Sequence, residues 1–223
     1  MIKFYFLVLF LIVGIRAIII QNEQDLIDKL STLNDKDSLT INSDITVTKN
    51  ISFPSSLNKL SLIGNSQSSI KFNYPLYFDE DLKEIEFKDI TIYGSLLFHN
   101  NKRITLNSVI LNGNIESDID ENSNEYIKFI NVIYRPFSSM SYPNCINLQG
   151  NVDILDSKFY GGASCQDRLF NYDGLKKYNL IIRNSYLNGE YQCSCIGITQ
   201  SLSAKIEYTE FRNGFSNEKI EGG

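Results

Sequence analysis

A short phrase recurs along this chain and constrains its fold more than any other feature of the sequence. The phrase has two apolar residues spaced two apart, a polar residue two positions later, and another apolar residue three positions after that. Clear copies cover residues 85–94, 104–113, 152–161 and 180–189, and weaker copies cover 39–48, 60–69, 127–136 and 204–213. Consecutive copies begin about 19 to 28 residues apart.

Aligning the copies gives apolar columns. The first column contains Leu39, Leu60, Ile85, Ile104, Ile127, Val152, Leu180 and Ala204, and the second contains Ile41, Leu62, Phe87, Leu106, Phe129, Ile154, Ile182 and Ile206. A third column, after the polar position, contains Ile92, Leu111, Tyr134, Phe159, Leu187 and Phe211. A spacing of two residues points both side chains to one face of a short strand. Each copy therefore predicts a strand, a tight corner and a second strand.

The corner column contains Asp89, Asn131, Asp156 and Asn184. We expect these residues to line one corner, and their side chains to form a polar ladder that hydrogen-bonds from copy to copy. Several copies end on glycine, where we expect a backbone with positive φ: Gly94, Gly113, Gly161 and Gly189.

One such unit cannot bury its apolar row alone, but stacked units can do so at a strand spacing of ~4.8 Å. The sequence therefore predicts an all-β fold, a right-handed parallel β-helix of about eight rungs over residues 37–215. The alternative is an antiparallel β-sandwich, which also places turns at short intervals.

The N-terminal residues have the pattern of a targeting segment. Lys3 precedes an apolar run from Phe4 to Ile15, which is the length of a signal-peptide core. We expect residues 1–17 to be a signal peptide cleaved between Ala17 and Ile18. A signal anchor is the alternative, because Ile18 to Ile20 prolongs the run beyond Arg16. No later stretch is apolar enough to span a membrane.

The ends of the solenoid are predicted to differ. Residues 18–36 form an N-terminal cap segment, in which Asn22 to Leu33 reads as an amphipathic helix with Asn22 as its N-cap. Such a helix would cover the apolar end of the first rung. Residues 216–223 read as a polar C-terminal tail.

Leu60-Ser-Leu-Ile-Gly64, behind a capping helix and an apolar first rung, resembles the start of a β-helix of the pectin-lyase-like superfamily. The later Asn-Ser-x-apolar-x-Asn-Gly phrase, as in Asn184 to Gly189, is similar to that of its secreted repeat proteins. The resemblance covers roughly residues 22 to 215. Enzymes of the superfamily are mostly polysaccharide lyases or hydrolases, but their Asn-Thr-Asp, Asp-Asp, Gly-His-Gly and Arg-Ile-Lys phrases are missing here. The resemblance therefore implies a non-catalytic member without a cofactor.

Cys145, Cys165, Cys193 and Cys195 all lie in the last rungs, and a secretory route favours pairing. Cys165 lies eleven residues beyond Ile154, and Cys193 lies eleven beyond Ile182. This register favours a Cys165–Cys193 bridge, which leaves Cys145 with Cys195. The alternatives are Cys145–Cys165 with Cys193–Cys195, and four reduced thiols.

Other candidate residues are weaker. His99 stands alone in a turn-like segment and is expected to be exposed. Calcium could bind among Asp79, Glu80 and Asp81, or among Asp118, Asp120 and Glu121, although linear acidic runs are usually solvated loops. The tyrosines expected outside the core columns are Tyr74, Tyr77, Tyr142 and Tyr172.

Asn50-Ile51-Ser52 is a glycosylation sequon in a secreted protein. The net charge is −5 without a basic tract, which excludes nucleic acid as an expected partner.

These observations favour a secreted or cell-surface, non-catalytic β-helix protein that serves as a structural, adhesive or binding module for polysaccharide or another surface protein. The alternative is a carbohydrate-active enzyme, a polysaccharide lyase or a glycoside hydrolase. A convergent cluster of acidic and basic side chains on one strand face would distinguish the two, and the sequence shows none.

Overall fold

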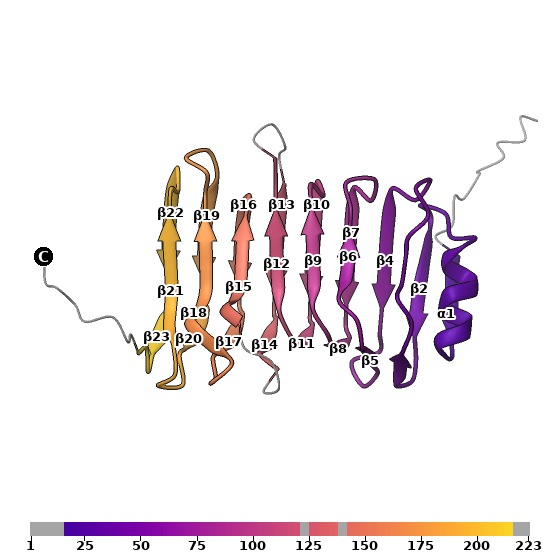
Figure 1. The fold of residues 1–223 in the computed structure, drawn as a ribbon, viewed down its shortest axis with the longest axis horizontal. Coiled ribbons are helices and arrows are strands. Elements are labelled where there is room, and N and C mark those ends of the chain that lie inside the picture. The colour runs from indigo at the N-terminus through magenta and orange to yellow at the C-terminus, as the bar shows by residue number, and fades with distance from the viewer. Residues whose placement is uncertain (1–15, 121–124, 138–141, 216–223) are drawn as a thin grey trace, which may run out of the picture.

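The chain folds into a parallel β-solenoid, which a computed structural model describes over residues 16–120, 125–137 and 142–215. From β4 onward the turns run through three sheets in the same order, so that strands far apart in the sequence stack side by side (Figure 1). The fold class predicted from the repeat is confirmed. Most of the predicted signal peptide, residues 1–15, and the predicted tail, residues 216–223, lie outside the described residues.

The three sheets differ in their number of strands. Sheet A has nine: β1 (Arg16–Ile20), β2 (Asp37–Ile41), β4 (Lys59–Ile63), β7 (Glu84–Lys88), β10 (Arg103–Asn107), β13 (Tyr126–Ile130), β16 (Asn151–Leu155), β19 (Asn179–Arg183) and β22 (Ser203–Glu207). Sheet B has eight: β3 (Ile45–Val47), β5 (Ser69–Phe72), β8 (Thr91–Tyr93), β11 (Ile110–Asn112), β14 (Ile133–Arg135), β17 (Lys158–Tyr160), β20 (Tyr186–Asn188) and β23 (Glu210–Arg212). Sheet C has six: β6 (Leu76–Phe78), β9 (Leu96–His99), β12 (Ile115–Asp118), β15 (Tyr142–Gln149), β18 (Cys165–Asp173) and β21 (Ser194–Thr199).

The strand register follows the predicted columns from the second copy onward. Leu60 lies opposite Ile85, and the pairing continues along the first column to Ala204. The first copy departs from the prediction, because Leu39 lies opposite Leu62 rather than Leu60. The segment between β2 and β4 has no sheet C strand, and the different path of that turn changes its register by two residues.

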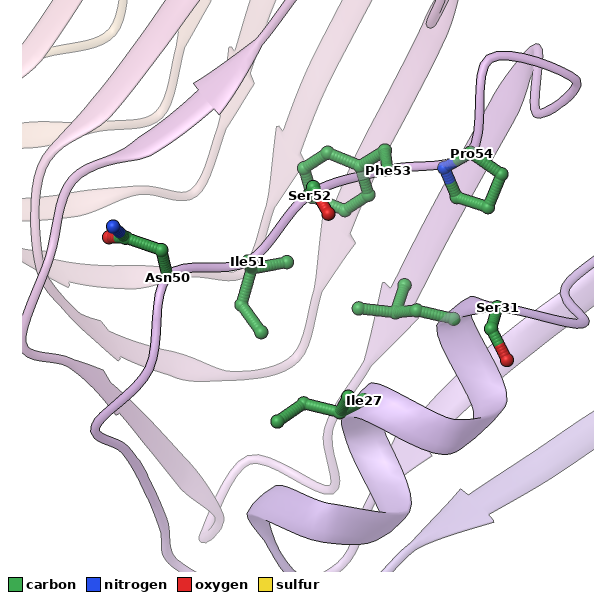
Figure 2. A pocket seen from close by; sticks show the side chains of 8 residues that line it. Ile27, Ser31, Asn50, Ile51, Ser52, Phe53 and Pro54 are labelled. Atoms are coloured by element: carbon green, nitrogen blue, oxygen red, sulfur yellow. The ribbon is translucent and has the colours of Figure 1, made fainter.

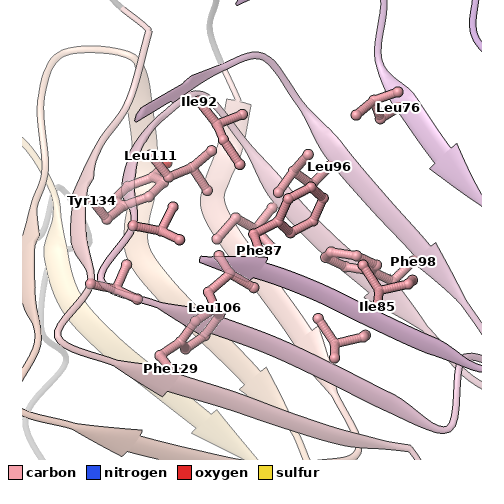
Figure 3. Packing of buried hydrophobic residues seen from close by; sticks show 14 of the residues in the cluster. Leu76, Ile85, Phe87, Ile92, Leu96, Phe98, Leu106, Leu111, Phe129 and Tyr134 are labelled. Atoms are coloured by element: carbon pink, nitrogen blue, oxygen red, sulfur yellow. The ribbon is translucent and has the colours of Figure 1, made fainter. Parts of the chain in front are cut away.

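The apolar columns form one continuous core inside the solenoid. Phe87, Leu106 and Phe129 come from successive strands of sheet A and are fully buried, and Figure 3 shows them facing Leu111 and Tyr134 of sheet B. Aromatic rings continue the stacking across rungs, as Phe78 packs on Phe98 with ring centroids 5.0 Å apart. The core is therefore built from contacts between neighbouring rungs.

The corner from sheet A to sheet B is a single residue in the left-handed region. Asp89, Asn131, Asp156 and Asn184 all have φ of 51° or 52° there. Their backbone N–H groups donate hydrogen bonds to carbonyl oxygens of the next rung. The side-chain amide of Asn131 donates to the hydroxyl of Ser108 over 3.3 Å. A hydroxyl ladder lies one residue further on, where the N–H of Ser157 donates to Ser185 Oγ over 3.2 Å. These buried serines could not be predicted from the sequence, because one polar residue beside another carries no periodic signal.

The glycines that close the repeats are needed for close packing more than for positive φ. Only Gly94 of the four has a positive φ, at 151°. At Gly113 a Cβ would lie 1.8 Å from the carbonyl oxygen of Gly94 in the neighbouring rung. The expectation of positive φ was wrong for Gly113, Gly161 and Gly189, because the stacked turns approach too closely for a side chain.

The N-terminal end is covered by α1 (Glu23–Leu30), as Figure 1 shows. Asn22 is its N-cap, since its side chain accepts a hydrogen bond from the Asp25 N–H over 3.0 Å. The helix ends three residues earlier than predicted, because the hydroxyls of Ser31 and Thr32 bond to preceding carbonyls and compete with the helix. Leu26 and Leu30 face the first rung and are buried.

Strand β1 was not predicted from the sequence. Ile18 and Ile20 are buried while Ile19 is 55% exposed, which is the alternation of a strand with one face in the core. In the sequence, Ile18 to Ile20 continue the apolar run of the predicted signal peptide. Because all three are isoleucine, the sequence does not show the alternation of a strand. The predicted cleavage site falls inside β1, and cleavage there would leave Ile18 to Ile20 to pair with β2.

Candidate functional site

The predicted glycosylation residue lies on the surface beside the cap. Asn50 is exposed and begins the segment that runs to Pro54 across α1, as Figure 2 shows. A pocket of about 270 Å³ lies between this segment and α1, and it is lined by Ile27, Leu30, Ser31 and residues 50–54. The structure thus leaves Asn50 accessible for modification.

The disulfide differs from the preferred pairing. Cys145 bonds to Cys165, with a Cα–Cα distance of 5.2 Å. The expectation of Cys165–Cys193 was wrong because the rungs differ in length. Val152 pairs with Leu180, 28 residues later, whereas Arg168 pairs with Ser194, 26 residues later. Equal distances from sheet A therefore do not place Cys165 and Cys193 opposite each other.

Cys193 and Cys195 remain unpaired thiols within the solenoid end. The Cys195 thiol donates to the carbonyl oxygen of Arg212 over 3.1 Å. Burial raises the pKa of both thiols, which keeps them protonated and poorly reactive.

His99 is the last residue of β9 and not part of a turn. Its ring stacks on Tyr77 with centroids 6.5 Å apart, and its Nδ1 lies 3.5 Å from Asp118 Oδ2. Its side chain is 31% exposed, so the expectation of an exposed turn histidine was wrong. Nearby, the Asn100 side chain donates to Asp120 Oδ2 over 2.7 Å.

Near Asn101 and Asp118 lies Glu125, a buried residue that no sequence pattern indicated. It is 1% exposed, and both of its carboxylate oxygens lack a hydrogen-bond partner. Burial raises its pKa to about 8. The Asn101 N–H and the Ser117 hydroxyl lie near enough to oppose this rise, but the Ser117 hydroxyl donates to the Gln149 carbonyl instead. Glu125 followed a polar loop in the sequence, and nothing there distinguished a buried glutamate from a solvated one.

The acidic runs considered as possible calcium sites do not converge over the described residues. Over the described residues, no group of three or more His, Cys, Asp and Glu side chains converges to hold a metal ion. Asp79 caps its own turn by accepting from the Asp81 N–H over 3.3 Å. Glu121 lies outside the described residues.

The four tyrosines expected outside the core divide into different groups. Tyr74 and Tyr77 are 50% and 52% exposed. Tyr172 is fully buried, and its hydroxyl donates to the Gly150 carbonyl over 2.9 Å, so its assignment outside the core was wrong. Its hydroxyl can be buried because the turn offers that carbonyl. The side chain of Tyr142 lies outside the described part of the chain.

The outer face of sheet A gathers the acidic and basic cluster that the sequence did not reveal. Lys59 and Arg103 lie on either side of Glu84, at 4.0 and 3.4 Å. With Glu86 and Thr105 they line a pocket of about 190 Å³. These residues occupy outward positions of three successive strands, and only the correct stacking brings them together.

The C-terminal end is the most exposed apolar part of the described structure. The last rung consists of β21, β22 and β23, each the final strand of its sheet (Figure 1). Its inward columns, buried elsewhere, are open here: Ile206 is 38% exposed and Phe211 is 40% exposed. Large apolar side chains beside them are also exposed, namely Leu202, Tyr208 and Phe215.

This end can bind a partner in two ways. Its strand edges offer unpaired N–H and C=O groups, and its apolar side chains offer surface that burial would stabilise. At the opposite end α1 packs against the first rung and buries Leu26 and Leu30 there. The sequence predicted a capping helix at the N-terminal end and a polar tail at the C-terminal end, but it did not show which apolar side chains of the last rung are exposed.

Comparison of the chain with family models, with curated proteins and with solved structures finds no match. Among the described residues, no helix is both long and apolar enough to cross a membrane.

Proposed function

We propose that the protein is a secreted, non-catalytic β-helix protein that serves as an extracellular or cell-surface binding module and interacts through its C-terminal rung. The exposed apolar rung carries this proposal, because apolar groups that are buried in every other rung are open to a partner there. The Cys145–Cys165 bridge supports the location, since disulfides persist in oxidising compartments.

The proposal is tested by placing charges on the open rung. We expect the double variant Leu202→Asp/Phe211→Asp to lose binding to intact cells of the producing organism and to a polysaccharide array. Tyr77→Asp is the matched control, because Tyr77 is 52% exposed on sheet C, away from that rung. Equal binding by all three proteins would reject the C-terminal rung as the interaction surface.

A carbohydrate-active enzyme is the second candidate, and the charged pocket on sheet A favours it. Glu84 and Glu86 lie beside Lys59 and Arg103, which is the combination that acid–base chemistry on a polysaccharide needs. Glu125 does not extend this site, because its carboxyl group is buried and a sugar cannot reach it. Release of sugars from the array by the wild type, lost in Glu84→Gln/Glu86→Gln, would establish the enzyme and reject the non-catalytic module.

A further inference from the structure

We propose that the C-terminal rung binds a second copy of the same chain, end to end about a two-fold axis, with the two β22 strands antiparallel and centred on Ile206. This inference rests on the proposed function, because it names the partner of the same surface. It follows from the direction of the backbone groups, the order of the charges along β22 and the difference between the two ends.

The backbone of β22 presents Ile206 to the open edge. The Glu207 carbonyl accepts a hydrogen bond from the Asn184 N–H over 3.1 Å, so Glu207 faces the preceding rung. Backbone groups of alternate residues in a strand point to opposite edges, and Ile206 therefore directs its N–H and C=O away from the solenoid. Two copies with Ile206 opposite Ile206 would exchange two hydrogen bonds, as antiparallel pairs of this kind do.

The charges of β22 select this register. Lys205 and Glu207 flank Ile206, and they form an ion pair of 3.0 Å on the exposed outer face of the strand. A two-fold axis at Ile206 places Lys205 of each copy opposite Glu207 of the other, which gives two attractive cross-strand pairs. An axis at Lys205 would place two ammonium groups opposite each other, and directly opposed like charges destabilise a strand pair.

The apolar side chains at this end favour the same arrangement. Ile206 points inward in its rung but is 38% exposed, because no described rung lies above it. A second copy would continue the inward column with its own Ile206. Phe211 and Phe215, at 40% and 46% exposure, would also be covered by that copy.

The two ends also limit the assembly. An interface in which both copies use the same surface is closed and gives a dimer, whereas head-to-tail contacts give open filaments. The N-terminal end differs from this one, since α1 packs against the first rung there. We therefore expect dimers and no larger species.

Charge reversal tests the register. Light scattering after size-exclusion chromatography should show that the wild type is a dimer which dissociates on dilution. Lys205→Glu and Glu207→Lys should each weaken the dimer about tenfold or more, because each single change creates two repulsive pairs. The double variant Lys205→Glu/Glu207→Lys should restore dimerisation, because it exchanges the charges and keeps them opposite. Circular dichroism of each variant checks that the solenoid itself is unchanged.

Disulfide trapping gives a second, independent readout. In the proposed register, residue 205 of one copy and residue 207 of the other form a non-hydrogen-bonded pair with Cα atoms about 4.5 Å apart, which lies within disulfide range. A mixture of Lys205→Cys and Glu207→Cys chains should therefore form a covalent dimer on mild oxidation. Neither variant alone should do so, and the wild type controls for Cys193 and Cys195.

A competing register is distinguishable. Glu210, Phe211 and Arg212 of β23 also place opposite charges on either side of an apolar residue. One axis can be centred on only one strand, so trapping in a mixture of Glu210→Cys and Arg212→Cys chains would reject the β22 register.

The two proposals fail separately. A wild type that stays monomeric at high concentration overturns the second-copy proposal. The binding module stands if Leu202→Asp/Phe211→Asp then still loses cell binding. A dimer whose cell binding is unaffected by those two changes rejects the proposed function and keeps the dimer.

Discussion

Single residues are decisive where the solenoid buries a polar group or a large ring. Glu125 is the clearest case, because a carboxyl group without hydrogen-bond partners avoids ionisation inside the protein. Phe129 is the apolar counterpart, with a fully buried ring that meets the Phe159 ring edge-on at a centroid distance of 6.0 Å. The sequence identified Phe129, which belongs to a column, and missed Glu125, which belongs to none.

The buried carboxyl group predicts an unusual pH dependence of stability. The pKa of Glu125 is raised from 4.5 to about 8, so between these values the folded state holds a proton that the unfolded state releases. Its contribution is therefore complete below about pH 4.5 and is lost as the pH rises through about 8. The loss is on the order of 5 kcal/mol from the size of the shift. Glu125→Gln cannot ionise and should keep its stability over this range.

Urea unfolding of the wild type and of Glu125→Gln between pH 5 and 9 measures this effect. The difference in free energy of unfolding between the two proteins isolates Glu125 from the other titrating groups. A difference that stays constant across the range would contradict the buried, protonated carboxyl group.

The core ring predicts a large loss on truncation. Phe129→Ala removes the ring and leaves a cavity between rungs, and such changes cost about 3–5 kcal/mol. Tyr77→Ala is the control, because its ring is half exposed and its loss should cost much less. Chemical denaturation measures both, and similar costs would show that Phe129 does not lie in the core.

Each strand and the helix contact neighbouring rungs. The sequence predicted the strands better than it predicted the disulfide and the hydrogen bonds that join them. The strands that carry the apolar columns were predicted correctly. A two-residue period that repeats in several copies permits few alternative strand registers. The disulfide pairing was misjudged because loop lengths move the cysteines relative to that period. The carboxylate of Glu23 accepts hydrogen bonds from the Thr48 and Lys49 N–H groups and so links α1 to the turn after β3. No sequence pattern predicted that contact.

The disulfide should stabilise the C-terminal rungs. Cys145 and Cys165 close a loop with a sequence separation of 20, for which the chain-entropy estimate is about 3 kcal/mol. Cys145→Ser/Cys165→Ser should lower the free energy of unfolding by about this amount, and Cys193→Ser by less. Peptide mapping under non-reducing conditions should identify the 145–165 link. A 165–193 link would instead restore the pairing first expected from the repeat.

The cap helix should be required for a soluble first rung. Leu26→Asp/Leu30→Asp places two charges against the core, and we expect the detached helix to expose strand edges and apolar side chains of β1 and β2. The variant should melt at a lower temperature and aggregate, whereas Gln24→Asp on the exposed helix face should do neither. A double variant that stays soluble with unchanged melting would show that α1 does not protect the end.

At the scale of the whole molecule, each described strand pairs with strands of the adjacent rungs, and this property was predictable from the repeat alone. The charged pocket on sheet A was not, because its residues sit at outward positions where the repeat tolerates any residue. Nor was the exposure of the last rung, since Ile206 and Phe211 look like core residues in their columns. Periodicity identifies what the rungs share, while the candidate sites depend on how individual rungs differ.

The position of α1 near the start of the solenoid, between β1 and β2, has a consequence for how the chain is made. During synthesis the N-terminal residues emerge first, so the cap and first rung are available before later rungs exist. Each later turn then finds a completed edge on which to form, and no turn has to wait for a distant segment of the chain. Folding can therefore keep pace with translation, and β22 and β23 are the last of the described strands to form.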